Sequence, residues 1–88
     1  MKRRLSERIS AKLAIPLDAI SNDPLLELVG ATQARIDHHQ GILEYRDERI
    51  VVRTRLGAIE IQGAELRVVQ MSRRRIVIRG RISLAQLV

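Results

Sequence analysis

The residues of this sequence that could do chemistry begin with a pair of histidines. His38 and His39 follow Asp37, and this is the only cluster with the residue types of a metal site. Adjacent residues of a strand point to opposite faces, so the two imidazoles are badly placed to bind one ion. A catalytic zinc usually takes three protein ligands. Gln40 and Gly41 come next and favour a hairpin loop with solvated histidines, so we expect no metal site.

The carboxylates and hydroxyls also lack the neighbours that catalysis needs. Glu44, Asp47 and Glu48 surround an expected tight turn beside Arg46 and Arg49, which predicts ion pairs in solvent and not an acid–base pair. The serines at positions 6, 10, 21, 72 and 83 have no base near them in the sequence, and no glycine-rich phosphate loop is present. Cysteine is absent, which removes thiolate ligands and nucleophiles. We expect a protein that is not an enzyme and holds no cofactor.

Arginine supplies most of the positive charge, and the formal net charge is +6. The densest group is residues 73–75, with Arg79 and Arg81 nearby. Such charge favours an acidic partner, which is a nucleic acid, an anionic membrane or an acidic protein. Charged hairpin tips also simply remain in water and discourage edge pairing. Single-stranded nucleic acids usually need aromatic stacking, and Tyr45 is the only aromatic residue. Nucleic-acid binding is therefore the alternative hypothesis, carried by phosphate contacts alone.

The first 20 residues have a helical period. Leu5, Ile9 and Leu13 recur every four positions, which predicts an apolar stripe on a short helix. The rest of that helix is basic, with Lys2, Arg3, Arg4, Arg8 and Lys12. Pro16 limits its length, and residues 21–24 form a turn cluster. Two uses of this arm remain open: it rests on an anionic membrane or an acidic partner, or it packs its stripe on the body.

No stretch of the sequence predicts export or membrane insertion. No apolar run approaches the about 20 residues of a membrane-spanning helix. The basic start of the chain is not followed by the apolar segment of a signal peptide. We expect the chain to stay in the compartment where it is made.

From Leu25 onward the period changes to two, which is typical of an antiparallel β-meander. The expected turns are Asp47-Glu48, Leu56-Gly57 and a three-residue loop at residues 72–74. Their registers keep the apolar residues on one inner face. The inner pairs are Tyr45–Ile50, Leu43–Val52, Thr54–Ile59, Val52–Ile61 and Val68–Ile78, and the outer pairs are Arg53–Glu60, Arg67–Arg79 and Val69–Val77.

Three glycines share one position in this pattern. Gly30, Gly63 and Gly80 each follow two inward-pointing apolar residues, and glycine inside a strand usually marks a bulge or a bend. Repeated bends would fold the meander onto itself as a small roll, sandwich or barrel.

Some apolar residues fall on the outer face of the expected sheet. These are Val51, Val69, Met71 and Val77, and either a second layer or a partner must cover them. Arg67 and Arg79 pair across the last hairpin on the same side. We predict that these six residues contact a second copy of the chain or a membrane partner, with the arginines selecting an acidic counterpart.

Four segments of the body carry a resemblance to a known family. They are residues 37–45 (DHHQGILEY), 48–54 (ERIVVRT), 57–66 (GAIEIQGAEL) and 76–82 (IVIRGRI). In this order and spacing they make residues 20–88 resemble the YabP/YqfC family of sporulation proteins. The resemblance implies a protein of endospore-forming bacteria that is made in the mother cell and helps to build the spore. It implies no catalytic residues, and it suggests a membrane protein like YqfD as partner.

We therefore expect a mainly β protein with a basic helical arm at residues 1–20 and an all-β domain at residues 21–88. Its expected function is that of an interaction or assembly module in endospore formation. We expect it in the cytoplasm of the mother cell, peripherally at the outer forespore membrane.

Overall fold

The computed structural model describes residues 23–88, so the arm predicted at residues 1–20 lies outside the described residues. The described part contains six strands and no helix: β1 (Leu25–Val29), β2 (Gln33–Asp37), β3 (His39–Arg46), β4 (Arg49–Thr54), β5 (Gly57–Met71) and β6 (Arg75–Leu87). They form one sheet in the order β1-β2-β6-β5-β4-β3, with every pair antiparallel. The prediction of a mainly β, antiparallel fold is confirmed.

The sheet is not the simple meander that we expected. β2 pairs with β6 and not with β3, so the chain crosses from one part of the sheet to another between them. The crossing takes one residue, His38, whose φ of 63° is left-handed. The N–H groups of His38 and His39 both donate to the carbonyl of Arg74, at 2.6 and 3.5 Å. Order along the chain therefore does not give order in the sheet.

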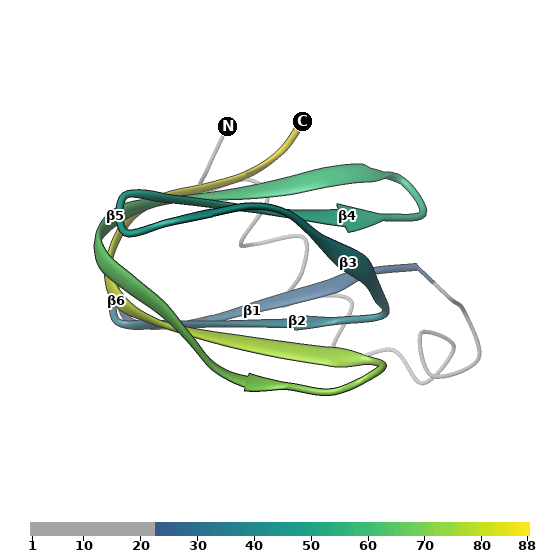
Figure 1. Cartoon of the computed structure of the whole chain (residues 1–88), viewed down its shortest axis with the longest axis horizontal. Helices are drawn as coiled ribbons and strands as arrows, with labels where there is room; N and C mark the ends of the chain where they lie inside the picture. Colours follow the sequence, from purple (N-terminus) through teal and green to yellow (C-terminus); the bar gives the residue numbers. More distant parts are fainter. Residues whose placement is uncertain (1–22) are drawn as a thin grey trace.

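β5 and β6 are long and bent, and they fold the sheet into two layers (Figure 1). The β2 layer consists of β1, β2, the first half of β6 and the second half of β5. The β4 layer consists of β3, β4, the first half of β5 and the second half of β6. The structure thus refines the expected roll, sandwich or barrel into a sandwich made from one folded sheet.

Two of the three glycines lie at these bends. The β5–β6 register shifts between Gln62 and Gly63. A Cβ added to Gly63 would overlap the carbonyl oxygen of Arg81, and one added to Gly80 would lie 2.6 Å from the carbonyl oxygen of Glu65. Gly80 also has a φ of +146°, which L-residues rarely adopt. Gly30 does not bend a strand, because it lies in the β1–β2 turn.

The turns of two hairpins hold the bends in place. In the β3–β4 turn, the carbonyls of Glu48 and Asp47 accept the N–H groups of Gly63 (3.1 Å) and Leu66 (2.8 Å). In the β1–β2 turn, Thr32 and Ala31 do the same for Gly80 (3.1 Å) and Ile82 (2.7 Å). Backbone groups that a bend removes from the ladder are thereby satisfied.

The predicted registers are right in part. The Asp47-Glu48 turn, the loop at residues 72–74 and three of the predicted pairs are confirmed, namely Tyr45–Ile50, Val68–Ile78 and Arg67–Arg79. Two predicted pairs are wrong because Leu43 and Val69 lie at β-bulges: Ile42 takes the place opposite Val52, and Gln70 the place opposite Val77.

The predicted turn at Leu56-Gly57 is displaced by one residue. The turn is Arg55-Leu56, so Thr54 lies opposite Gly57, Val52 opposite Ile59 and Arg53 opposite Ala58. The Thr54 hydroxyl accepts the N–H of Leu56 (3.2 Å) and donates to the carbonyl of Gly57 (2.9 Å), which stabilises this turn. Partners change by two residues, so each side chain keeps its face.

The core between the layers is entirely aliphatic. It contains Leu26, Ala34, Ile36, Ile50, Val52, Ile59, Ile61, Leu66, Ile76, Ile78 and Ala85. Both layers contribute, so neither could bury its inner face without the other.

Candidate partner-binding surface

The six residues predicted to form a partner-binding face do not form one surface. Val51 and Val77 are buried, with exposed fractions of 7% and 8%. They also belong to different layers, since Val51 is on β4 and Val77 is paired between β2 and β5. The other four, Arg67, Val69, Met71 and Arg79, are exposed and lie in the β2 layer.

A polar network accounts for the burial of Val51. Val51 lies between Glu44 and Glu60 in the register, and Arg49 of the same strand forms ion pairs with both carboxylates. The Glu60 carboxylate is the centre of this network, because it accepts bonds from Arg49 Nε (2.5 Å), Gln62 Nε2 (2.8 Å) and Gln86 Nε2 (2.6 Å). Long polar side chains thus enclose the valine, and its outer face is not free for a partner.

The same network perturbs the ionisation of Glu60. The hydrogen bond from Arg49, followed by those from Gln62 and Gln86, lowers the pKa of Glu60 from 4.5 to about 2. The carboxyl group is therefore held as a carboxylate in the folded protein. Glu44 also forms ion pairs with Arg46 and Arg49, as predicted for the residues around this turn. These ion pairs and hydrogen bonds link neighbouring strands of the β4 layer, so we assign the network a structural role.

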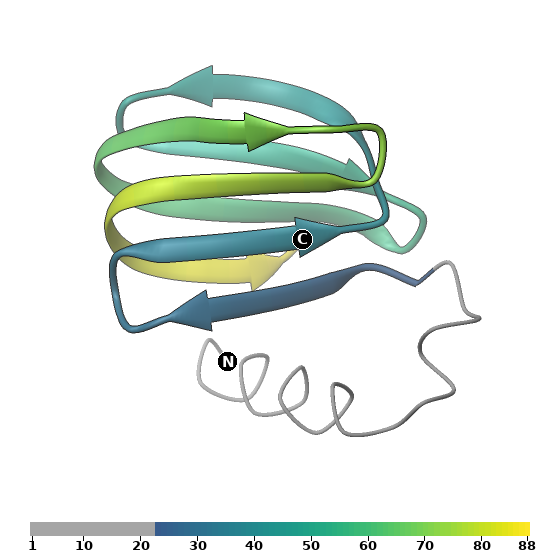
Figure 2. The same cartoon turned by 90° about the horizontal axis from the view of Figure 1, so that it is seen from below.

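One side of the sandwich is closed by contacts between β3 and the second half of β5, which we call the seam. At one end, His39 Nε2 donates to the carbonyl of Ser72 at 2.7 Å. At the other end, the N–H of Val68 donates to the Tyr45 hydroxyl at 2.9 Å. No ladder pairs these two strands. They are neighbours in the view of Figure 2, but Figure 1 shows that they belong to different layers. The seam is therefore held at its ends and lacks a ladder in between.

Four large apolar side chains are half-exposed along the seam. They are Leu43 and Tyr45 of β3 and Val69 and Met71 of β5, with exposed fractions of 56%, 53%, 53% and 55%. Leu43 and Val69 are both bulge residues, and bulges in edge strands redirect side chains. We call these four residues the seam patch.

Sequence reasoning found only half of the seam patch. It identified Val69 and Met71, but it did not expect Leu43 and Tyr45 to be exposed. Tyr45 does pair with the core residue Ile50, yet its side chain is half-exposed. Leu43 and Tyr45 come from a strand that precedes β5 by two elements, and only the folding of the sheet brings the strands together. The one available signal was Tyr45, because a lone aromatic residue in an aliphatic chain is favoured at the edge of a core where its hydroxyl finds a partner.

The two histidines do not share a loop or a ligand. The expectation of a solvated hairpin loop is wrong, because His39 starts β3 and both residues are partly buried. His38 Nδ1 lies 3.0 Å from the carbonyl of Asp23. His39 Nδ1 accepts the N–H of Gly41, which leaves Nε2 as the donor to Ser72. Within residues 23–88, no three histidine, aspartate or glutamate side chains gather as metal ligands would.

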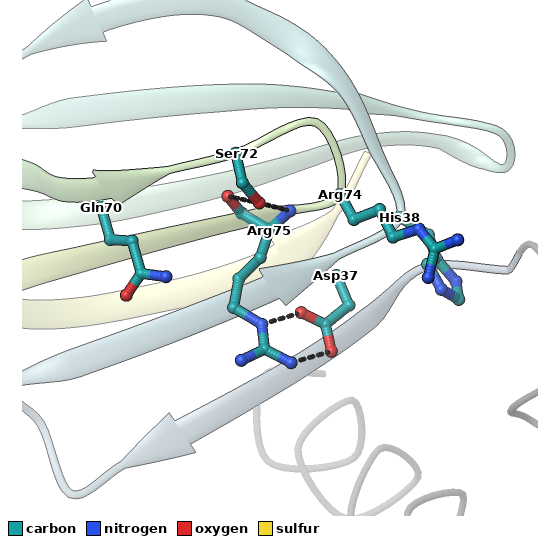
Figure 3. A pocket seen from close by; sticks show the side chains of 6 residues that line it. All are labelled: Asp37, His38, Gln70, Ser72, Arg74 and Arg75. Carbon is teal, nitrogen blue, oxygen red and sulfur yellow. Dashed lines mark hydrogen bonds and ion pairs between the residues drawn. The ribbon is translucent and has the colours of Figure 1, made fainter.

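A pocket of about 290 Å³ lies beside His38 at the β5–β6 loop (Figure 3). Its lining is polar: Asp37, His38, Gln70, Ser72, Arg74 and Arg75. Arg75 Nε binds Asp37 Oδ1 at 2.7 Å, so that pair is neutralised. Arg74 is exposed and has no ion pair within the described chain, so the pocket's net charge is positive.

Comparison with known proteins identifies the family. The model of the YabP family matches residues 22–88, which include every strand described above. The chain belongs to the YabP family. Membership indicates a sporulation-related protein. No curated protein and no solved structure matches the chain. The described residues contain no helix that is long and apolar enough to cross a membrane.

Proposed function

We propose that this YabP-family domain is a non-enzymatic interaction module of endospore formation, working through a protein partner in the cytoplasm of the mother cell. The observation that supports the proposal is the seam patch. Soluble monomers seldom leave several large apolar side chains uncovered next to one another. Here two bulges and an open stretch between β3 and β5 keep four of them at the surface.

The side chains of the seam patch indicate what kind of surface would complement it. Tyr45 and Met71 are residue types enriched at protein interfaces. The exposed guanidinium of Arg67 lies two residues from Val69 and has no ion pair within residues 23–88. An apolar protein surface with an acidic rim complements this arrangement. A membrane protein like YqfD, suggested by the family resemblance, is the partner we propose, and a second copy of the chain is the competing occupant.

The test replaces the exposed apolar groups with charge. We expect Val69→Lys with Met71→Lys to lose the membrane-protein partner in pull-downs from sporulating cells and to lower the yield of spores. Val29→Lys with Leu56→Lys is the matched control, because these residues are equally exposed (52% and 50%) and lie away from the seam. Unchanged melting temperatures for both variants would show that the fold is kept.

Two results would contradict the proposal. One is a seam variant that captures the partner and supports sporulation as well as the parent does. The other is an equal loss in the control variant, which would mean that added charge itself causes the effect. Sedimentation of the purified chain separates the two occupants, since a seam dimer would become monomeric in the seam variant alone.

A further inference from the structure

The two layers of the sandwich differ in charge. The β2 layer, with Asp23 and the β5–β6 loop, carries seven arginines and four carboxylates, whereas the β4 layer and its turns carry four of each. The net positive charge of residues 23–88 therefore comes from the β2 layer alone. A surface charge that is separated in this way creates a directed electrostatic field and favours anionic surfaces on one side only.

The excess charge on the β2 layer is not balanced by ion pairs among residues 23–88. Its four carboxylates are engaged: Glu27 with Arg35, Asp37 with Arg75, Glu65 with Arg81, and Asp23 with Arg55 of the β4–β5 turn. Four exposed arginines, Arg67, Arg73, Arg74 and Arg79, have no ion pair within the described residues. We call them the free arginines.

The placement of two free arginines opposes stability. Arg67 and Arg79 lie directly opposite each other on β5 and β6, and like charges at such positions destabilise a sheet. Neither has a carboxylate partner in the described part of the chain to relieve the repulsion. An anion from outside the chain would relieve it.

We propose that the outer face of the β2 layer docks on an anionic phospholipid membrane. The free arginines lie at both ends of this face, Arg67 and Arg79 near the bends and Arg73 and Arg74 at the loop. About five strand residues, or roughly 16 Å, separate the two pairs. Lipid headgroups cover an area continuously, so both pairs can meet phosphates at once. The pocket beside Arg74 provides a recess for one headgroup (Figure 3).

Two further observations select a membrane over the other polyanions. The 22 residues before Asp23 carry five basic and two acidic side chains, and they join the body at β1, a strand of the same layer. A basic segment that precedes a basic layer in the sequence adds to the charge that an anionic membrane attracts. Nucleic acids are less suitable, because the outer face of the β2 layer has no aromatic residue on which bases could stack.

The test measures co-sedimentation of the full chain with vesicles of phosphatidylglycerol and phosphatidylcholine, compared with phosphatidylcholine alone. We expect binding only to the anionic vesicles and its loss at high salt. Each arginine near such a surface contributes roughly fivefold, so Arg67→Gln with Arg79→Gln should weaken binding about 30-fold. Arg73→Gln with Arg74→Gln should have a similar effect.

The control removes the same charge from the other layer. Arg46→Gln with Arg53→Gln leaves Glu44 paired with Arg49, and we expect it to change vesicle binding little. In addition, Arg67→Glu should raise the melting temperature while it weakens binding, a combination that a merely structural role of Arg67 would not produce.

Three results would overturn the proposal. The first is equal weakening by both layers' variants, which would indicate net charge alone. The second is full vesicle binding by the β2-layer variants, which would assign binding to the arm. The third is a chain that still binds duplex DNA or an acidic protein at a salt concentration high enough to abolish vesicle binding. That result would indicate that a membrane is not the preferred partner.

Discussion

At the scale of single residues, the most constrained polar group of the domain is Glu60. Its side chain lies on the outer face of the β4 layer, yet only 5% of the residue is exposed. A carboxylate in that position needs hydrogen bonds to replace the water it has lost. Arg49, Gln62 and Gln86, from three strands, supply them. Glu60 thus holds β4, β5 and β6 together from outside the core.

We predict that Glu60 makes stability depend on pH in the acid range. Its pKa is about 2 in the folded protein and about 4.5 in the unfolded chain. Because the folded pKa is lowered, the stabilisation is complete above pH 4.5 or so and is lost as the pH falls towards 2. Glu60→Gln should therefore lower the melting temperature at neutral pH, and its difference from the parent should shrink over that acid window.

The control for this prediction is Glu48→Gln. Glu48 is exposed and forms no ion pair within the described chain. A difference between the Glu60 variant and the parent that stays constant from neutral pH to pH 2 would show that the carboxylate charge is not involved.

At the scale of elements, the bends in β5 and β6 decide the architecture. Without them, two strands of this length would extend as a flat hairpin and leave the aliphatic residues in water. The bend in β5 requires a residue without a side chain, since the backbone of β6 occupies the space where the Cβ of residue 63 would lie.

We predict that Gly63→Ala destabilises the domain by at least about 2 kcal/mol, because backbone atoms cannot move aside as a flexible side chain could. Gly30→Ala is the control. It introduces the same methyl group at a left-handed position with open space around it, and should cost about 1 kcal/mol. Urea or thermal unfolding would measure both. Equal effects would mean that the contact with β6 is not what matters at Gly63.

At the scale of the whole molecule, the two layers of the described domain enclose one aliphatic core. Among the described residues, eleven form this core, and they extend from Leu26 to Ala85. The two proposed surfaces, the seam patch and the outer face of the β2 layer, adjoin each other at Arg67 on β5.

We predict that deleting residues 1–22 leaves a domain that still unfolds cooperatively, since its strands and core are retained. Thermal unfolding followed by circular dichroism would measure this. A small fall in melting temperature would favour the arm packing on the body, whereas unchanged stability with weaker vesicle binding would favour an arm that rests on the membrane. An unfolded product would show that the arm completes the core.

The residues alone determined which face of β4 and of the first half of β5 is inside. Ile50, Val52, Ile59 and Ile61 were placed inward, and they are buried even though one predicted turn was displaced. The period of two is local and survives a register error of two residues. The sequence also predicted the charged loop at residues 72–74 and the bends at Gly63 and Gly80, because the residue types at these positions are themselves local signals.

Only the tertiary structure decided the order of the strands and the surface that results. The pairing of β2 with β6 joins two strands that are separated by three others along the chain. The burial of Val51 depends on carboxylates from both neighbouring strands, and the seam patch depends on two bulges and on β3 lying beside β5. These features arise from contacts between residues far apart in the chain. The alternation of apolar and polar residues along one strand carries no information about such contacts.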